Sequence, residues 1–369
     1  MKILHIVGTR PHFIKLAPII EVSKNNNDIK NIVVHTDQHY AYELSKIFFD
    51  EFGIPLPDYH LDVGSGTHGI QTGQMLERLD PVLIKEQPDV VLVYGDTNTT
   101  LAGALAAYKF HIPCGHIESG MREHIWRPEE INKKIADFCS DFLFCSTKTA
   151  VQNLLNEGIN KEKIFLTGDI TYDTFIQSAK IAKKRSTIHE KMNIPNKFIL
   201  LTMHRAETVD IYKEVIGIVD AMLKIKEKII YPIHPRTKKT LQQFGLYERI
   251  KNSDNIELIE PVGYFDFIEL LLSAQLVITD SSGVLKEAFY GLKPCITLDY
   301  STEYPEIFNV GYNILAGHST DMILKSIDYM IDKKLLPLEN NPLGSGNASE
   351  KILKILLEKK VKFTGLAKV

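Results

Sequence analysis

Short apolar runs alternate with longer amphipathic segments from one end of the chain to the other. Apolar runs bounded by Gly, Pro and polar residues are typical of buried parallel strands, whereas apolar positions three or four residues apart predict helices. Strands are predicted near 2–8, 30–36, 89–94, 112–117, 142–145 and 163–167, and again near 198–203, 229–234, 256–259, 276–280 and 295–298. This alternation predicts the α/β class, with parallel sheets covered by helices on both faces.

The two sets of strands predict two doubly wound, Rossmann-like domains that face a cleft. A chain of 369 residues also exceeds what one small core usually organises. We expect an N-terminal domain over 1–172 with the acidic residues described below, and a second domain over 173–347. Residues 348–369 are expected to contain an amphipathic helix, from about Ala348 to Lys359, that packs back on the first domain.

Composition and charge exclude several classes of partner. The net charge is −3 and the sequence pI about 6.5, so no nucleic-acid-binding surface is indicated. No apolar run approaches the roughly 20 residues that span a bilayer, and residues 1–8 resemble a strand rather than a signal peptide. The four cysteines lack CxxC or Cys/His metal spacing. We therefore expect a cytoplasmic protein with reduced, buried thiols, no metal site and no membrane partner.

Three carboxylates follow predicted strands in the first third of the chain. Asp96 ends the apolar run 90–95, Glu118 ends 112–117, and Glu129 stands a short loop further on. Carboxyl ends of parallel strands meet at one sheet edge, where ligands bind in open α/β folds. Carboxylates gathered there can transfer protons. The alternative for Glu129 and its neighbour Glu130 is a plain helix start after Pro128, a role that we favour for Glu130 only.

Two turns between a strand and a helix have the composition of anion sites. Arg10 and Lys15 lie at the first turn, where helix amide groups and positive side chains can attract a phosphate. In the second half, small residues permit close approach of a phosphate, and Glu287 one turn later could bind both hydroxyls of a ribose. The residues of this second turn are Ser281, Ser282 and Gly283. The alternatives are an ordinary turn with solvated cations and a simple helix N-cap.

Cationic side chains also end two consecutive strands of the second half. His204 and Arg205 follow the strand near 198–203, and His234 and Arg236 follow the strand near 229–234. Such residues are commonly loop or cap residues. In a cleft, however, they suit the negative charge that develops on a leaving diphosphate.

Taken together, these segments resemble the non-hydrolysing UDP-N-acetylglucosamine 2-epimerase family. The motifs that carry the resemblance run in order along the chain: GTRPHFIK at 8–15, TDQH at 36–39, YGDT at 94–97, HIESG at 116–120, RPEEIN at 127–132, HRAE at 204–207 and TDSSG at 279–283. Within the family, HPRT at 234–237, PVGY at 261–264 and THG at 67–69 are most similar to the branch that acts on UDP-2,3-diacetamido-2,3-dideoxy-D-glucuronic acid. The resemblance implies a GT-B-like fold, a homodimer and no cofactor.

The family reaction is elimination and readdition at C2 of a UDP-2-acetamido sugar, which supplies a manno-configured sugar for surface polysaccharide. The resemblance assigns Asp96, Glu118 and Glu129 to proton transfer and His204 to the leaving diphosphate. It places the UDP-sugar against the following residues: Arg10, Lys15, His234, Arg236, Phe267, Ser281, Ser282, Gly283 and Glu287. Gln38, His39 and Gln71 are candidates for an allosteric substrate site.

Four departures from the family pattern stand close to these motifs. Asp37 replaces the Gly of Thr-Gly-Gln-His, and Lys133 replaces the Arg that follows Glu-x-Asn. Ser282 and Leu285 replace Gly and Gln of Asp-Ser-Gly-Gly-x-Gln, and Asp299-Tyr300 replaces Arg-Asp or Arg-Glu. Three alternative functions follow from the same scaffold: a hydrolysing epimerase that releases UDP, a GT-B glycosyltransferase, and a sugar-nucleotide-binding protein without turnover.

Overall fold

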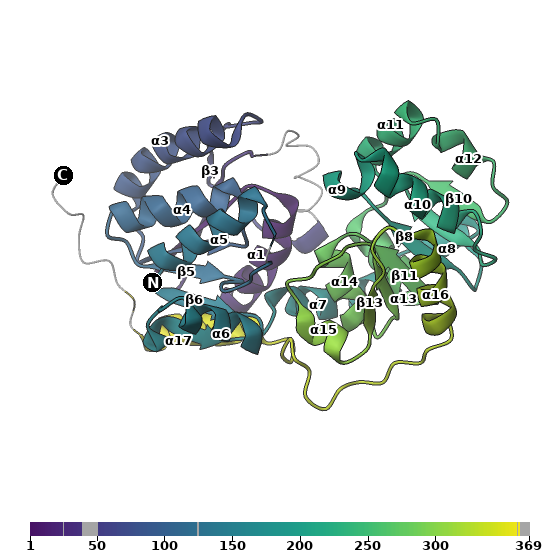
Figure 1. Ribbon diagram of the computed structural model, residues 1–369. Coiled ribbons are helices and arrows are strands. Elements are labelled where there is room, and N and C mark those ends of the chain that lie inside the picture. The colour runs from purple at the N-terminus through teal and green to yellow at the C-terminus, as the bar shows by residue number, and fades with distance from the viewer. Residues whose placement is uncertain (25, 39–50, 124, 360, 362–369) are drawn as a thin grey trace. The chain divides into compact units, whose positions relative to one another are not determined.

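The computed structural model describes residues 1–369 except 25, 39–50, 124, 360 and 362–369, so His39 lies outside the described residues. The chain divides into two units (Figure 1). The first unit comprises Met1–Thr174 and Asn341–Val369, and the second comprises Phe175–Asn340.

A seven-stranded parallel sheet forms the centre of the first unit, in the order β3-β2-β1-β4-β5-β6-β7. Its central strands are apolar and buried on both faces, as expected when helices cover both sides. The strands are β1 Lys2–Val7, β2 Lys30–His35, β3 Tyr59–His60, β4 Val90–Tyr94, β5 Cys114–Ile117, β6 Phe142–Cys145 and β7 Ile164–Leu166.

Successive residues of these strands point to opposite faces and so divide the core of this unit. Ile3 and Val7 pack in a cluster with helices α1 and α17, whereas Leu4 and Ile6 pack in a cluster with α3 and α4. The helices of the unit are α1 Arg10–Ser23, α3 His68–Glu86, α4 Asn98–Lys109, α5 Pro128–Cys139, α6 Lys148–Asn156, the 3₁₀ turn η1 Lys161–Lys163, the start of α7 Ile170–Arg185, and α17 Ala348–Glu358.

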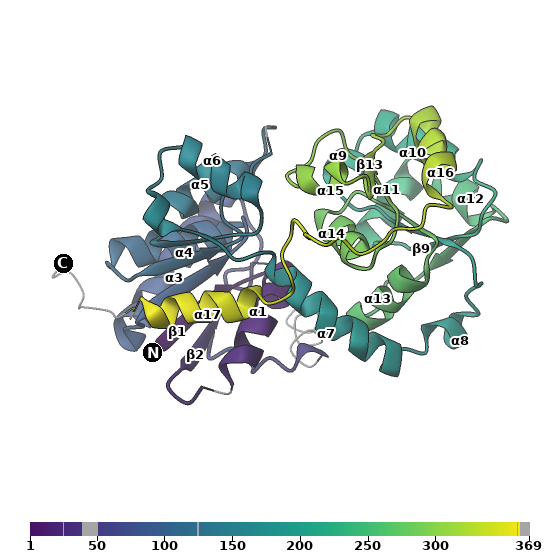
Figure 2. The same ribbon diagram turned by 90° about the horizontal axis from the view of Figure 1, so that it is seen from below.

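Helix α17 returns the chain to the first unit and lies beside α1 (Figure 2). Its apolar face contributes Ile352 and Leu356 to the same core cluster as α1. Asp173 accepts hydrogen bonds from the amide groups of Ala348 and Ser349, at 3.1 and 2.8 Å, and so satisfies the start of α17. Burial raises the pKa of Asp173, against the opposing effect of these hydrogen bonds.

The second unit repeats the arrangement with a six-stranded parallel sheet in the order β10-β9-β8-β11-β12-β13. Its strands are β8 Ile199–Thr202, β9 Ile229–Pro232, β10 Ile256–Ile259, β11 Leu276–Thr279, β12 Cys295–Thr297 and β13 Asn313–Leu315. Its helices, besides the end of α7, are α8 Ile188–Met192, α9 Ala206–Val209, α10 Tyr212–Met222, α11 Pro235–Gln243, α12 Tyr247–Lys251, α13 Tyr264–Ser273, α14 Ser282–Tyr290, α15 Pro305–Asn309 and α16 Thr320–Met330.

Two parallel sheets with helices on their faces confirm the predicted α/β class, and each predicted strand has a counterpart. Strands β3 and β13, of two and three residues, were not predicted. In the described part of the chain, no helix is long and apolar enough to cross a bilayer. All four cysteines are free. Burial raises the pKa of Cys114, Cys145 and Cys295 to about 12, whereas Cys139 is only half-buried.

Candidate functional site

Asp96 and Glu118 lie at the ends of adjacent strands in the first unit. Tyr94 of β4 pairs with Ile117 of β5, and the amide of Gly95 donates to the oxygen of Ile117 at 3.0 Å. Both strand ends leave the sheet through left-handed backbone, with φ of 65° at Gly95 and 71° at Glu118. For a residue other than glycine this conformation is strained, and it clusters at functional sites. The sheet edge thus holds the two carboxylates as the sequence predicted.

Glu118 forms an ion pair with Lys15 of α1, and each side chain is only 10% exposed. A Cβ atom at Gly95 would lie 2.9 Å from Lys15 Nζ and 3.6 Å from Glu118 Oε2. Glycine is therefore required between Tyr94 and Asp96 both for its backbone conformation and for the space that the ion pair occupies. The negative charge of Glu118 is therefore held beside the positive charge of Lys15 at a nearly buried position.

Helix α5 brings a second cation and an amide group to Asp96. Lys133 Nζ lies 4.0 Å from Asp96 Oδ2 and 2.7 Å from Glu130 Oε1. Asn132 Nδ2 donates to the backbone oxygen of Asp96 at 3.0 Å. Glu129 lies in the first turn of the same helix and is half-buried. Asp96 is 37% exposed, so its carboxylate has access to a ligand.

A buried charged network connects the elements that carry these carboxylates. His116 in β5 faces two acceptors, Asp137 Oδ1 at 2.6 Å and the backbone oxygen of Gly95 at 2.7 Å. Asp137 of α5 also accepts from Arg122 at 2.7 Å, and Arg122 pairs with Glu157. Burial opposes the charge on Arg122, but its two carboxylate partners raise its pKa above the usual range.

The sequence pattern does not reveal this network. It includes His116 only within the HIESG motif and gives no prediction for Asp137. The signal that could have identified Asp137 is a charged residue on the buried side of an amphipathic helix, since such a residue needs a partner. Its partners are separated from it by 15 and 21 residues, so the network forms only in the folded chain.

The turn after β1 differs from a simple amide cradle for a phosphate. The amide of Gly8 already donates to His12 Nδ1 at 3.1 Å. Arg10, the first residue of α1, is exposed, and Lys15 is paired with Glu118. Any anion at this turn would therefore be attracted by these cationic side chains rather than by the amide of Gly8.

The allosteric candidates Gln38 and Gln71 join a polar chain that leads toward Asp96. Gln38 Oε1 accepts from the backbone amide and the hydroxyl of Thr99 at 3.0 and 2.7 Å. Gln71 Nε2 donates to the backbone oxygen of Gln38 at 3.1 Å. Gln71 also accepts from Asn98, whose side-chain oxygen lies 3.3 Å from Asn132 Nδ2. This series of hydrogen bonds therefore links both glutamines to Asn132, which donates to the backbone oxygen of Asp96.

In the second unit, the ends of β8 and β11 are joined by a buried carboxylate. Asp280 Oδ2 accepts from the amide groups of His204 and Arg205, both at 2.8 Å. Its other oxygen lies 3.6 Å from His204 Nδ1, and the His204 side chain is 45% exposed. The rings of His204 and His234 are 5.8 Å apart. The two histidines predicted at neighbouring strand ends are therefore adjacent.

Arg205 connects the small-residue turn of α14 to Asp299. Its guanidinium pairs with Asp299 Oδ2 at 2.7 Å and donates to the hydroxyl of Ser282. Ser281 is the N-cap of α14, because its hydroxyl accepts from the amide of Val284 at 3.4 Å. Asp299, which replaces an Arg of the family pattern, thus takes up part of the positive charge of Arg205.

The remaining predicted binding residues of this unit lie on three helices. Glu287 of α14 is 8% exposed and accepts from the hydroxyl of Tyr264 at 2.8 Å. Phe267 is half-buried on α13. Arg236 forms an exposed ion pair with Asp210, near the N-cap His234 of α11.

Comparison with known proteins identifies the family. Residues 21–357 match the family described as UDP-N-acetylglucosamine 2-epimerase. The chain belongs to this family. It is 47% identical over 362 residues to a UDP-N-acetylglucosamine 2-epimerase homologue of Methanococcus maripaludis, with 96% of this chain and 99% of the relative covered.

Two further family members extend the comparison. The UDP-2,3-diacetamido-2,3-dideoxy-D-glucuronate 2-epimerase of Pseudomonas aeruginosa is 42% identical over 362 residues, with 96% and 99% of the two chains covered. The crystal structure of Methanocaldococcus jannaschii UDP-GlcNAc 2-epimerase in complex with UDP-GlcNAc and UDP has a TM-score of 0.90, at 45% identity and with 97% and 100% of the chains covered. These matches confirm the predicted family and its GT-B-like fold.

Proposed function

We propose that this epimerase inverts C2 of a UDP-2-acetamido sugar, either UDP-N-acetylglucosamine or UDP-2,3-diacetamido-2,3-dideoxy-D-glucuronic acid. The single observation that carries the proposal is the placement of Asp96 and Glu118 on adjacent strand ends, each beside a lysine. Inversion needs a group that removes a proton and a group that returns one. Two carboxylates at one sheet edge supply both.

The proposed reaction proceeds by elimination and readdition. A carboxylate of the set Asp96, Glu118 and Glu129 takes the C2 proton, the C2–H electron pair forms a C1=C2 double bond, and the C1–O bond to UDP breaks. The glycal and UDP then recombine after a proton is added to the opposite face of C2. Lys15 and Lys133 stabilise negative charge in this set, and the buried pair of His116 with Asp137 holds its supporting elements in place.

The second unit is proposed to bind the nucleotide. His204 and Arg205 would face the diphosphate, together with the hydroxyls of Ser281 and Ser282 and the backbone at Gly283. Glu287 would bind the ribose, which requires it to exchange its hydrogen bond from Tyr264 for ribose hydroxyls. The remaining contacts are proposed for Phe267, His234 and Arg236.

The domain roles and cellular setting are part of the same proposal. Residues 1–172 would supply the acid/base groups, 173–347 the nucleotide site, and 348–369 the helix that returns to the first unit. The four free cysteines are compatible with a reducing cytoplasm. We also propose a homodimer that serves surface polysaccharide synthesis, with Gln38, His39 and Gln71 in a substrate-sensing site.

The experiment is an NMR screen of both UDP-sugars with the full-length protein in deuterated water. Epimerisation predicts a manno product with deuterium at C2. Accumulation of free UDP and free sugar without an acceptor would instead indicate the hydrolysing alternative, and a strict acceptor requirement would indicate a transferase. Binding of UDP-sugar without deuterium exchange would identify a non-catalytic relative.

A further inference from the structure

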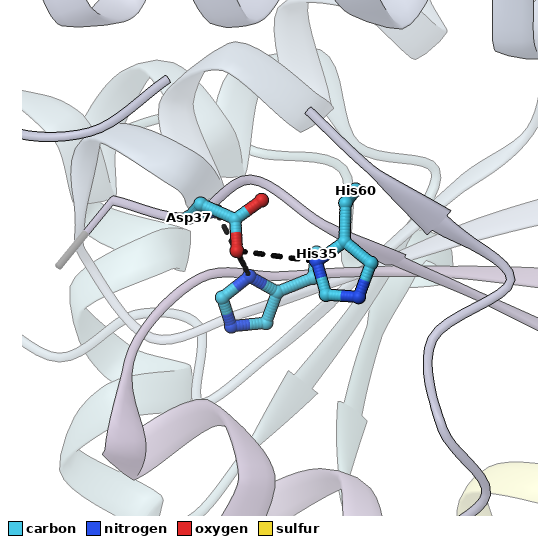
Figure 3. A group of neighbouring side chains, drawn as sticks. All are labelled: His35, Asp37 and His60. Carbon is cyan, nitrogen blue, oxygen red and sulfur yellow. Dashed lines mark hydrogen bonds and ion pairs between the residues drawn. The ribbon is translucent and has the colours of Figure 1, made fainter. Parts of the chain in front are cut away.

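Three side chains of the kinds that ligate metals, none of them in the proposed acid/base set, converge in the first unit (Figure 3). His35 ends β2 and His60 ends β3, and the two residues are direct neighbours in the strand register. Asp37 follows β2 and directs Oδ1 between the two rings. His35 Nδ1 lies 2.5 Å from this oxygen, and His60 Nδ1 lies 3.2 Å from it. All three ligand atoms are within 4.8 Å of one another.

We propose that His35, Asp37 and His60 bind a divalent transition metal ion of the Zn²⁺ class. Two imidazole nitrogens and one carboxylate oxygen are a ligand set that suits Zn²⁺, Ni²⁺ or Co²⁺ and does not suit Mg²⁺ or Ca²⁺. Ligands about 2.0–2.2 Å from one tetrahedral ion are roughly 3.3–3.6 Å apart. The His60–Asp37 separation of 3.2 Å is close to this spacing, whereas the His35 ring, at 2.5 Å, must rotate away from the carboxylate to admit an ion.

Neighbouring groups hold two of the three ligands in place. The His35 ring is buried and stacks on Phe13, with centroids 5.3 Å apart and an interplanar angle of 11°. The second carboxylate oxygen of Asp37 accepts from the amide of Asp62 at 3.0 Å, which leaves Oδ1 directed at the rings. Arg78 in turn donates to the backbone oxygen of Asp62 at 2.6 Å. Such outer contacts orient ligands in metal sites.

Asp37 has a backbone conformation that is uncommon for residues other than glycine. Its φ is 56°, in the left-handed region that favours glycine. At this position the chain therefore carries, in place of the favoured glycine, a carboxylate that lies between two histidines. Backbone strain of this kind persists where interactions with the surrounding structure hold the residue in place.

The cluster is also accessible from solvent. The His60 side chain is 33% exposed and that of Asp37 is 19% exposed, whereas His35 is 2% exposed. An ion can therefore enter from the His60 side and complete its coordination with water. The sequence predicts no metal site, because its cysteines lack metal-ligand spacing. The structure brings together Asp37 and His60, which are 23 positions apart.

The bound ion would replace two existing interactions. The amide of Asp37 lies 2.9 Å from His35 Nδ1, and the carboxylate lies within reach of both rings. Metal ligation uses the imidazole lone pairs that protons otherwise occupy, so binding must weaken as pH falls and must release protons. This distinguishes a metal site from a cluster held together only by protonated histidines.

The test uses untagged, full-length protein that has been treated with a chelator and dialysed. Calorimetric titration with Zn²⁺ should show a single saturable site, and Co²⁺ should give visible absorption bands of a bound ion with nitrogen ligands. His60→Asn and Asp37→Asn should each weaken Zn²⁺ binding by at least about 10-fold. His111→Asn, which removes an exposed histidine at a left-handed position outside the cluster, should leave binding unchanged. Mg²⁺ should produce no effect.

Circular dichroism of each variant separates lost binding from lost folding, and His60→Asn is the decisive variant because its ring is the most exposed of the three. The proposal is overturned if the folded His60→Asn protein binds Zn²⁺ as tightly as the parent. It is also overturned if the parent shows no saturable site, or if its Co²⁺ spectrum matches that of the free ion. The readout does not depend on epimerase activity.

Discussion

The imidazole of His116 hydrogen-bonds the carboxylate of Asp137 at 2.6 Å, with both side chains fully buried. Through its other nitrogen, His116 holds the backbone oxygen of Gly95, the residue before Asp96. His116 itself stands two residues before Glu118, and Asp137 lies on the helix that carries Glu129. One buried pair therefore fixes the three elements that present the proposed acid/base groups.

This relationship predicts that His116→Gln acts on the chemical step. The glutamine can contact one partner but cannot span both, so the ends of β4 and β5 lose their common support. We expect kcat to fall by roughly 10–100-fold while KM for the UDP-sugar changes little, since the nucleotide contacts that we propose lie in the second unit. Steady-state kinetics provide the measurement, with His111→Asn as the matched control. If kcat falls only in proportion to the fraction of protein that remains folded, the role of His116 is purely structural.

Because Lys15 and Glu118 form an ion pair, substitutions at the two positions are predicted to have non-additive effects on the free energy of unfolding. Lys15→Met leaves a carboxylate without its partner at a nearly buried site and should lower the free energy of unfolding by about 3 kcal/mol. The double variant with Glu118→Gln should recover part of this loss, because no buried charge then remains unpaired. Denaturant unfolding of the two single variants and the double variant measures the coupling. Strictly additive losses would show that the pair contributes no interaction energy.

Asp299 is predicted to reduce the affinity for the diphosphate by neutralising Arg205. Asp299→Asn keeps the shape of the side chain but frees the guanidinium charge, so UDP should bind roughly 3–10-fold more tightly at low salt, with the gain shrinking as salt rises. Calorimetric titration with UDP measures this change. Asp220→Asn, which removes the partner of the exposed Arg249, serves as the control. Weaker UDP binding by Asp299→Asn would instead show that the ion pair is needed to shape the site.

The environment of His5 predicts that the protein loses stability below neutral pH. Burial lowers the pKa of His5 to about 4, although the hydrogen bond with Asn31 opposes this effect. The neutral ring fits its partners, because Tyr94 can donate to Nδ1 at 2.7 Å while Nε2 donates to Asn31 at 3.0 Å. Burial raises the pKa of Tyr94 well above its usual range, so the hydroxyl keeps its proton.

Since the pKa of His5 is lower in the folded state than in the unfolded state, the unfolded chain binds more protons between about pH 6.5 and pH 4. The stabilisation is complete above pH 6.5 and is lost as the pH falls through this window, by roughly 3 kcal/mol in total. Denaturant unfolding across this range measures the slope. His5→Asn should flatten it, and an unchanged slope in this variant would assign the acid sensitivity to other groups.

The sequence predicted the repeating strands because buried parallel strands form continuous apolar runs, and it placed Asp96 and Glu118 because strand ends share an edge. It could not predict β3 or β13, which are too short to show a period. It also missed His116 with Asp137, Arg205 with Asp299, and the His35 cluster. Each of these groups joins residues that are far apart along the chain, such as Asp37 and His60, and only the folded chain brings them together.

The proposed epimerisation depends on proton transfer by the carboxylates at the ends of β4 and β5. The most direct test compares the parent protein with Glu118→Gln and Asp96→Asn for deuterium incorporation at C2 of the UDP-sugar, with UDP affinity measured in parallel. We predict ready incorporation by the parent, and a loss of at least about 100-fold in each variant with UDP affinity within about 3-fold of the parent. Undiminished incorporation in both folded variants would contradict the assignment of these two carboxylates to the reaction.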